Sequence, residues 1–468
     1  MGNSQQGWRS TGSGGGGGGS VDSASNVGTG LELFKQKVLT DLQFRTLLNG
    51  KGINLAYSLS SNEIDVSLYT DVVGIQDGTG WYTFYSSLAL ALASAVSGDV
   101  ITLFSNITES TSSPITISSD IIINLNGYTY TYSPADTTFA IIGNTGTLKM
   151  YNGVVARTNS VQGSFGYNQG GVLNNKLTDV YLENVFLVNQ GKCVFRNAGK
   201  IFGGVIIGGS ATFNFSAYNE AGGSCINTIF YGTEAIYNEP TANLENCVII
   251  NETNSIAINN LGIAMNCSIY GFDNIVNGGI TQNCSFIDNT NSSTLVVSAI
   301  SNANILNCSI LQTNQNPTQD IIGLFAQSGS VVQNTSVSVL GNSPLVLGAD
   351  CLIQNSTFTI AFSSNTNSYP VCDIQGKNNF ITGCSFNYNR FSNSDIIMQI
   401  GDDGNVISKC TFFQQNKGNI CIQGIGGVRT AYIVNNDFLN AITCVDTTTI
   451  TQSQTSPSDL YGNIQKYP

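Results

Sequence analysis

Two adjacent aspartates, Asp402 and Asp403, come nearest to a catalytic arrangement in this sequence. A third carboxylate, Asp373, lies roughly one repeat unit earlier in the chain. Paired carboxylates are the groups that cleave glycosidic bonds by general acid and base catalysis. The pair stands, however, in the segment 401–405, Gly-Asp-Asp-Gly-Asn, which is typical of a solvated turn. We therefore assign no catalytic residue, and the role of Asp402 and Asp403 stays open.

Composition excludes several other kinds of site. The chain contains no histidine, which removes Ser-His-Asp and Cys-His nucleophiles and most zinc centres. Its 12 cysteines show no Cys-X-X-Cys spacing, so we predict no metal and no cofactor. A net charge of −12 with 17 lysines and arginines argues against nucleic-acid binding. No apolar run approaches the length of a transmembrane helix.

A short phrase, Asn-Cys-Ser-(Ile or Phe), returns throughout the C-terminal two thirds of the chain. The clearest copies begin at Asn266, Asn283 and Asn307. Looser copies begin at Asn246, Asn334, Asn355, Gly383 and Lys409. Successive copies start 17 to 28 residues apart, a period that predicts a solenoid in which each repeat packs on its neighbours.

Alternation of side chains along a strand indicates how one phrase is oriented. Cys284 and Phe286 share one face, and Ser285 between them takes the other, so the apolar pair points inward. Asn and Gly tolerate the left-handed backbone conformation, which predicts a corner between two short strands at the first residue of the phrase. Lys409 departs from this rule. Stacked repeats place Asn above Asn and Cys above Cys.

The cysteines have two interpretations. Twelve of them could form the disulfides of a secreted protein. Thr335 and Ser356 occupy the same slot as the repeated Cys, however, which favours a small buried side chain over a covalent partner. The polar, Gly-rich start does not read as a secretory signal. We favour reduced cysteines in a protein made in a cytoplasm.

The repeats resemble the right-handed parallel β-helix of the pectin-lyase-like superfamily, over roughly residues 81–450. This resemblance implies three strands per coil and an Asn ladder at one corner. A helix-forming segment at 86–96, followed by Gly98 and the strand Asp99-Val100-Ile101-Thr102-Leu103, resembles the element that covers the open end of such coils. The alternative is an ordinary amphipathic helix of an α/β protein. The Asn-Thr-Asp, Gly-His-Gly and Arg-X-Lys motifs of polygalacturonases are absent.

A second resemblance precedes the repeats. The segment Gly28-Thr29-Gly30-Leu31-Glu32-Leu33-Phe34-Lys35, the continuation Leu42-Gln43-Phe44-Arg45 and the alternating Ile64, Val66 and Leu68 resemble a module of bacteriophage tail-fibre proteins and of structural proteins of large DNA viruses. The alternative is an unrelated hairpin. The resemblance implies a virion protein that forms a homotrimer and binds other virion proteins through its N-terminal region.

We therefore predict an all-β chain built as a right-handed parallel β-helix with a short N-terminal capping helix. Its divisions are a flexible Gly/Ser-rich tether (1–28), a small fibre-type β module (29–70), the β-helix (81–450) and a polar C-terminal tail (451–468). The predicted function is a fibre-like virion protein whose rod attaches to host-surface glycans, with Tyr388 and Arg390 as examples of polar loop residues able to contact them. The alternative is a tailspike-like hydrolase or lyase that degrades polysaccharide.

Overall fold

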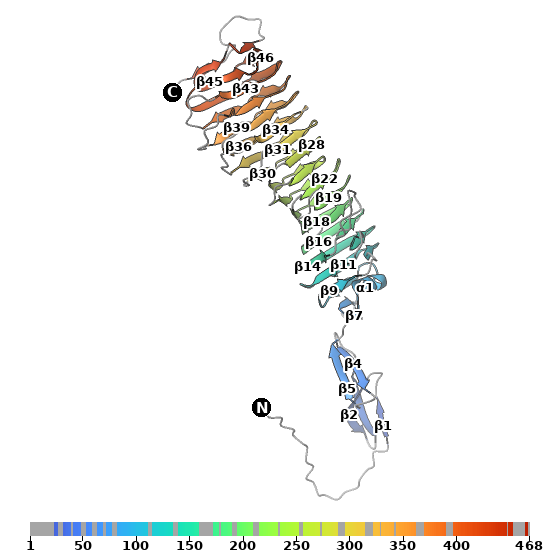
Figure 1. The fold of residues 1–468 in the computed structure, drawn as a ribbon. Helices are drawn as coiled ribbons and strands as arrows, with labels where there is room; N and C mark the ends of the chain where they lie inside the picture. The colour runs from blue at the N-terminus through green and yellow to red at the C-terminus, as the bar shows by residue number, and fades with distance from the viewer. Residues whose placement is uncertain are drawn as a thin grey trace, which may run out of the picture.

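The computed structural model describes the strands between residues 23 and 68, most of 72–452 and the strand at 464–466. Within 72–452 it leaves out residues 77–81, 111–114, 134–138, 159–171, 177–178, 190–193, 209–214, 233–234, 252–255, 272–273, 289–294, 314–321, 328, 341–342, 362–368, 390–395 and 447. The described chain is almost entirely β and is wound as a parallel solenoid, as predicted (Figure 1).

Each coil contributes up to three short strands, and like strands of successive coils pair in parallel to form three faces. The first face consists of β8 (Val100–Leu103), β11 (Ile121–Asn124), β14 (Thr147–Arg157), β16 (Asp179–Asn189), β18 (Lys200–Gly208), β20 (Ser224–Ile226), β23 (Asn243–Glu245), β26 (Ile263–Met265), β29 (Ile280–Gln282), β32 (Asn304–Leu306), β35 (Val331–Gln333), β38 (Leu352–Gln354), β41 (Phe380–Thr382), β44 (Asn405–Ser408), β46 (Arg429–Val434) and β48 (Ile450–Gln452).

The second face follows the corner that the Asn phrase marks. It consists of β9 (Ile107–Glu109), β12 (Thr129–Tyr132), the second halves of β14, β16 and β18, and then β21 (Ile229–Tyr231), β24 (Val248–Ile250), β27 (Ser268–Tyr270), β30 (Ser285–Asp288), β33 (Ser309–Gln312), β36 (Ser336–Leu340), β39 (Thr357–Ala361), β42 (Ser385–Tyr388), β45 (Thr411–Gly424), β47 (Asp437–Val445) and β49 (Ile464–Lys466).

The third face returns the chain to the start of the next coil. It consists of β10 (Ile115–Ile117), β13 (Ile141–Gly143), β15 (Leu173–Asn175), β17 (Phe195–Asn197), β19 (Ala217–Asn219), β22 (Ile236–Asn238), β25 (Ile258–Asn260), β28 (Asn274–Asn277), β31 (Leu295–Ile300), β34 (Ile322–Ala326), β37 (Leu345–Leu347), β40 (Cys372–Ile374), β43 (Ile396–Ile400) and the second halves of β45 and β47.

Residues at the corner between the first and second faces adopt the left-handed conformation that the sequence predicts. The φ angles are 55° at Asn266, 53° at Asn283 and 64° at Gly383. Lys409 also occupies its corner, with a φ of 56°, although this conformation costs a non-glycine residue about 1–2 kcal/mol. The Nδ2 of Asn283 donates to the Oδ1 of Asn266 (3.2 Å), and the Nδ2 of Asn307 donates to the Oδ1 of Asn283 (3.2 Å).

A second set of stacked asparagines lies inside the rod, where the third face turns into the first. Their side-chain amides form a continuous hydrogen-bonded row, each Nδ2 donating to the Oδ1 of the next coil at 2.7 to 2.9 Å. The members are Asn175, Asn197, Asn219, Asn238 and Asn260, and each is fully buried. The row satisfies polar groups in the core, where an unpaired amide costs free energy. The sequence analysis did not predict it.

In the repeated phrase, the Cys or Thr after the corner points inward and bonds to the main chain of its own coil and of the preceding coil. The Cys284 thiol donates to the carbonyl of Gln282 (3.2 Å) and accepts from the N–H of Cys267 in the preceding coil (3.3 Å). Thr335 does the same, since its hydroxyl donates to Gln333 (3.0 Å) and accepts from Cys308 N–H (3.4 Å). The eleven described cysteines are buried and free, in agreement with the reduced-cysteine interpretation.

Two residues further on, the inward position of the second face carries a row of stacked rings. They are Phe358, Phe386, Phe412 and Phe438, with successive ring centroids 5.4, 5.2 and 4.9 Å apart and nearly parallel planes. All four rings are fully buried. The Ile or Phe of the repeated phrase therefore forms the core between coils, as predicted.

The N-terminal end of the rod is closed by α1 (Leu88–Ser94) and a hairpin. Ser87 is the N-cap residue, and its Oγ accepts from Leu90 N–H (3.1 Å). The Glu109 carboxylate accepts from Leu88 N–H (2.9 Å). The hairpin of β6 (Val73–Gln76) and β7 (Tyr82–Tyr85) pairs antiparallel with β8, so the sheet reaches back to Val73. The helix ends four residues before Gly98, which was expected to stop it.

The remaining strands belong to two small sheets. β1 (Ser23–Asn26), β2 (Leu31–Val38) and β3 (Asp41–Leu47) form one, and β4 (Ile53–Ser58) and β5 (Glu63–Leu68) form the other. The rest of the predicted tether, 1–28, and most of the predicted tail, 451–468, lie outside the described residues. Within the described part of the chain, no helix has the length and apolar character that crossing a membrane requires.

Candidate functional site

The first face carries a hollow on its outer surface near the N-terminal end of the rod. It is lined by Thr147, Lys149 and Tyr151 of β14, by Tyr181, Leu182 and Glu183 of β16, and by Phe202 of β18. Alternation on β14 places Leu148 and Met150 in the core, so Lys149 and Tyr151 project outward. Because these strands pair in register, Lys149, Tyr181 and Phe202 lie in one row across three coils.

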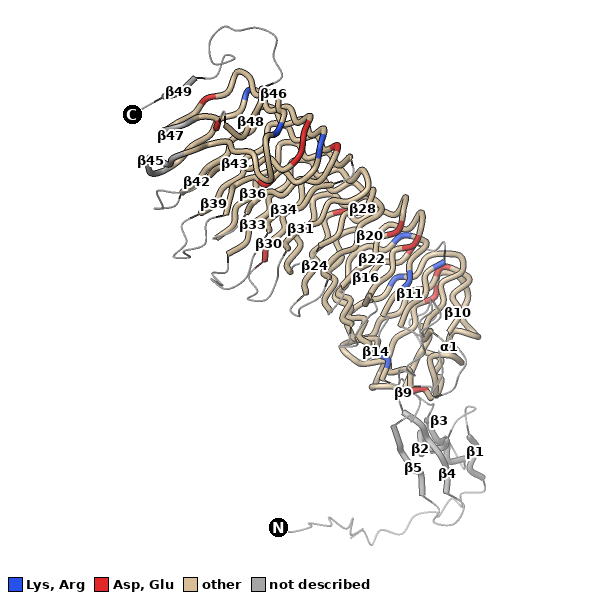
Figure 2. The backbone as a smooth tube through the Cα atoms, turned by 45° about the horizontal axis from the view of Figure 1, so that its top comes forward, with Lys and Arg blue, Asp and Glu red and all other residues tan. Residues whose placement is uncertain are grey.

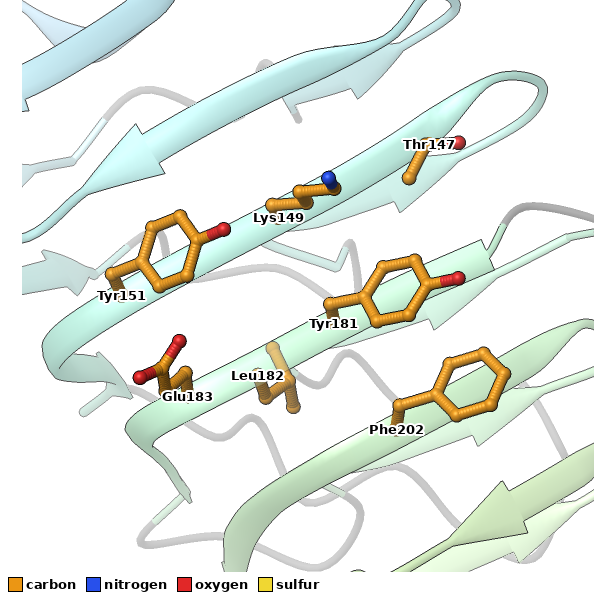
Figure 3. Close-up of a pocket in the computed structure, with 7 residues that line it drawn as sticks. All are labelled: Thr147, Lys149, Tyr151, Tyr181, Leu182, Glu183 and Phe202. Atoms are coloured by element: carbon orange, nitrogen blue, oxygen red, sulfur yellow. The ribbon is translucent and has the colours of Figure 1, made fainter.

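Two aromatic rings stand side by side in this hollow. The rings of Tyr181 and Phe202 are stacked, with centroids 4.7 Å apart and an interplanar angle of 9°. The Lys149 ammonium lies 5.7 Å from the Tyr181 centroid, a cation–π distance. Tyr151 and Glu183 lie opposite each other on the adjacent strands (Figure 3). The hollow has a volume of about 520 Å³.

This arrangement is chemically suited to binding a sugar. Phe202 and Lys149 cover the two faces of the Tyr181 ring, so a sugar would contact the outward edges of the two rings, and its hydroxyls need donors and acceptors beside them. Lys149, the Tyr151 hydroxyl and the Glu183 carboxylate supply both kinds of polar group. Glu183 is the only acidic residue in the lining. Glycosidases instead require two carboxyl groups separated by roughly 5–9.5 Å.

The acidic pair singled out in the sequence has structural bonds. Asp402 Oδ1 accepts from the N–H of Asp403 (2.8 Å), as expected for a turn. Asp403 Oδ1 accepts from Thr430 N–H in the next coil (2.7 Å). The structure places both carboxylates in the turn between β43 and β44, away from the hollow on β14–β18.

Asp373 lies on β40, where its side chain is half-buried. Burial raises the pKa of this carboxyl group, and the hydrogen bond from Gln375 Nε2 (2.8 Å) partly opposes that shift. A carboxyl group with a raised pKa can act as a general acid. Among the described residues, no group of three or more His, Cys, Asp or Glu side chains could hold a metal ion.

One predicted glycan contact is wrong. Tyr388 is not a loop residue, because its side chain points into the core from β42 and is only 2% exposed. It occupies the next inward position after Phe386, two residues further on, so strand alternation carries it inside. Arg390, named with it, lies outside the described residues.

The sequence analysis missed Lys149, Tyr181 and Phe202. Alternation within 148–151 indicates which side chains point outward. It does not align them with residues 181 and 202, because the coils here differ in length: the three residues are 32 and 21 positions apart. Finding the row of Lys149, Tyr181 and Phe202 requires the register between neighbouring coils.

Comparison with known proteins gave no sequence-level relative. No family model matches the chain, and no curated protein matches it either. Among solved structures, it is similar to the A-module of a mannuronan C-5 epimerase of Azotobacter vinelandii, with 11% identity, a TM-score of 0.26 and coverage of 81% of this chain and 93% of that one.

Two further likenesses come from other kinds of protein. Tailspike protein 3 of bacteriophage CBA120 shows 11% identity and a TM-score of 0.33, with 80% of this chain and 59% of that chain covered. PfbA, a surface adhesin of Streptococcus pneumoniae, shows 12% identity and a TM-score of 0.30, with coverage of 79% and 91%. At these scores the likenesses assign no function, and the fold rests on the strand pairing described above.

Proposed function

We propose that this protein is a fibre-like structural protein of a virion and that its β-helical rod binds glycans of the host surface. The observation that carries the glycan-binding part is the outward platform of Tyr181 and Phe202, with Lys149 over the Tyr181 ring. Tyr181 is 38% exposed. Without a ligand, this stacked pair therefore leaves apolar surface in contact with water.

The virion part of the proposal rests on the N-terminal segment. Its sequence resembles a module of tail fibres and of large-virus structural proteins, which supports attachment to other virion proteins through residues 1–70. The same resemblance supports a homotrimer. A rod assembled from stacked coils is suited to holding a binding surface away from an attachment point. The protein is accordingly proposed to be made in the host cytoplasm and carried in the virion.

A glycan-degrading enzyme is the second candidate. Asp373 favours it, because its carboxyl group has a raised pKa and faces outward from the third face. Cleavage by this route would require a second carboxylate near Asp373. Its products would be shortened chains, or an unsaturated sugar that absorbs ultraviolet light if the reaction is an elimination.

The binding proposal is tested with the purified full chain and a panel of cell-surface polysaccharides, by calorimetry. We expect Tyr181→Ala and Phe202→Ala each to weaken binding at least about tenfold, equivalent to ~1.4 kcal/mol. Phe380→Ala is the matched control, because Phe380 is an equally exposed aromatic on the same face in a distant coil (42% exposed). The assignment of the glycan site to Tyr181 and Phe202 is contradicted if all three variants lose the same amount of affinity. It is also contradicted if Tyr181→Ala and Phe202→Ala leave the affinity unchanged.

Two further measurements separate the remaining parts of the proposal. To test degradation, the same polysaccharides are incubated with the protein and the lengths of their chains are measured. If the chains are shortened and Asp373→Asn abolishes the shortening, the protein is the glycan-degrading enzyme of the second candidate. Mass spectrometry of purified virions tests the virion role, and absence of the protein from them would refute it.

A further inference from the structure

The outer surface of the second face is apolar over a long part of the rod. Two outward positions per strand align from coil to coil and form two parallel rows. The first row contains Phe186, Val205, Ile229 and Val248. The second row contains Val188, Ile207, Tyr231, Ile250, Tyr270, Ile287 and Leu311. Phe186, Ile229, Tyr270 and Leu311 are between 36% and 43% exposed.

The same two outward positions also lack charged residues in the coils before and after the apolar rows. From Val154 on β14 to Phe413 on β45, every aligned outward residue is apolar or an uncharged Ser, Thr or Asn. The buried Arg157 and Asp288 belong to the inward positions of this face. In Figure 2 the tube is tan along the strands labelled β33, β39 and β42, although the chain has a net charge of −12.

We infer that the second face binds a second copy of this chain. Two copies that each carry a net charge of −12 repel one another unless they meet where charge is absent, and among the described strands this face provides such a surface. A glycan would need several polar partners, and in these rows only Tyr231 and Tyr270 carry a polar group. Self-association also explains why bulky Phe, Ile and Tyr side chains stand outward in place of Ser and Thr.

The size of the surface agrees with this occupant. The second row spans seven coils, about 29 Å at the usual strand spacing, and the first row lies beside it over four of them. Their area is on the order of 400 Å², comparable with the largest apolar patches of soluble proteins. Beyond these rows, uncharged Ser and Thr side chains continue the surface over β36, β39 and β42. With them included, the buried area approaches the roughly 800 Å² per partner of a stable interface.

This inference deepens the homo-oligomer part of the proposed function and rests on it, but it is independent of the glycan hollow, which lies on the first face. The two therefore fail separately. Loss of glycan binding in Tyr181→Ala with an intact oligomer leaves the second-face contact standing. A monomeric wild type that still binds glycan refutes the contact together with the proposed homotrimer and leaves the glycan-binding part standing, whereas an oligomer that second-face substitutions leave unchanged refutes the contact alone.

The experiment is sedimentation velocity of the full chain over a concentration series. We expect an oligomer for the wild type and a monomer for the double variant Ile229→Glu/Tyr270→Glu, with circular dichroism unchanged because both side chains are solvent-exposed. Phe380→Glu is the matched control, since it adds one charge at an exposed aromatic of the first face and should leave the oligomer intact.

Three results would overturn the inference. One is a wild-type chain that stays monomeric throughout the micromolar range. Another is an oligomer that the double variant leaves unchanged, which would place the interface elsewhere. The third is a monomeric wild type that sediments with phosphatidylcholine vesicles while the double variant does not, which would assign the apolar rows to a lipid surface. If the double variant loses its circular-dichroism signal, the single variants Ile229→Glu and Tyr270→Glu replace it under the same criteria.

Discussion

At the scale of single residues, the slot after the corner in the repeated phrase holds a small side chain that both donates and accepts a hydrogen bond. Cys284 and Thr335 do this in the same way, by bonding to the carbonyl two residues earlier and to an N–H of the preceding coil. Ser356 does so as well, with 2.8 Å to Gln354 O and 3.1 Å from Thr335 N–H. Interchange of Cys, Thr and Ser therefore reflects hydrogen bonding in addition to size.

This hydrogen bonding predicts unequal effects of two near-isosteric changes at Thr335. Thr335→Cys keeps a donor and an acceptor and should change the free energy of unfolding by less than about 1 kcal/mol, whereas Thr335→Val leaves the buried N–H of Cys308 unpaired and should cost about 1–3 kcal/mol. Urea denaturation measures both, with Thr357→Val on the outward side of β39 as the control. A valine variant as stable as the wild type would show that these bonds do not stabilise the corner.

The same contacts bear on the chemistry of the thiols. Hydrogen bonding to Cys267 and Cys308, together with burial, raises the pKa of Cys284. Burial is the main cause of the raised pKa of Cys225 and of Cys372, and neighbouring charged groups raise both pKa values further. Hydrogen bonds from neighbouring thiols lower the pKa of Cys267, Cys308 and Cys384 instead. All these side chains are buried, so we attribute the low reactivity that we expect of them to exclusion from solvent.

At the scale of elements, the second face is held together by its row of inward rings. Phe412 lies between Phe386 and Phe438, at 5.2 and 4.9 Å, and so contacts both neighbouring coils. Each ring buries apolar surface and also fixes the alignment of one strand on the next. Lys409 keeps the left-handed corner conformation three residues before Phe412, and we attribute this to the packing of the following strand.

Truncation of this ring should weaken the coils on either side. We expect Phe412→Ala to lower the free energy of unfolding by about 3–5 kcal/mol, because a cavity remains between two coils. In a double-mutant cycle with Phe386→Ala, the coupling energy should be about 0.5–1.5 kcal/mol. Thermal and urea denaturation give both quantities. Phe380→Ala, on the solvent side of β41, should cost far less, and additive effects of the two inward substitutions would contradict the stacking.

At the scale of the whole molecule, one uninterrupted core runs from Val73 to Ile450. The described thiols all lie within it, and none is paired in a disulfide. We therefore expect no more than one of the 12 cysteines to react promptly with a thiol reagent in the native protein. All 12 should react after denaturation without reductant. A lower count in the denatured protein would reveal disulfides and restore the secreted-protein interpretation.

The fold followed from the sequence more completely than the site did. The corner at Asn283 and the inward positions of Cys284 and Phe286 are decided within four consecutive residues, so the repeated phrase was sufficient to predict the solenoid. The platform of Tyr181 and Phe202 and the buried row from Asn175 to Asn260 depend on alignment between coils of unequal length. Local patterns carry no information on that alignment. Tyr388 is a different case, because alternation after Phe386 already places it inside and the loop prediction overlooked this local pattern.

The stacking of like coils also bears on how such a molecule changes during evolution. Because strands pair mainly with their counterparts one coil away, deletion of residues 246–265 would join Glu245 to Asn266 and bring matching surfaces together. Gene duplication or loss of single coils can therefore adjust the reach of the protein in steps of about 4.8 Å while its two ends keep their own contacts.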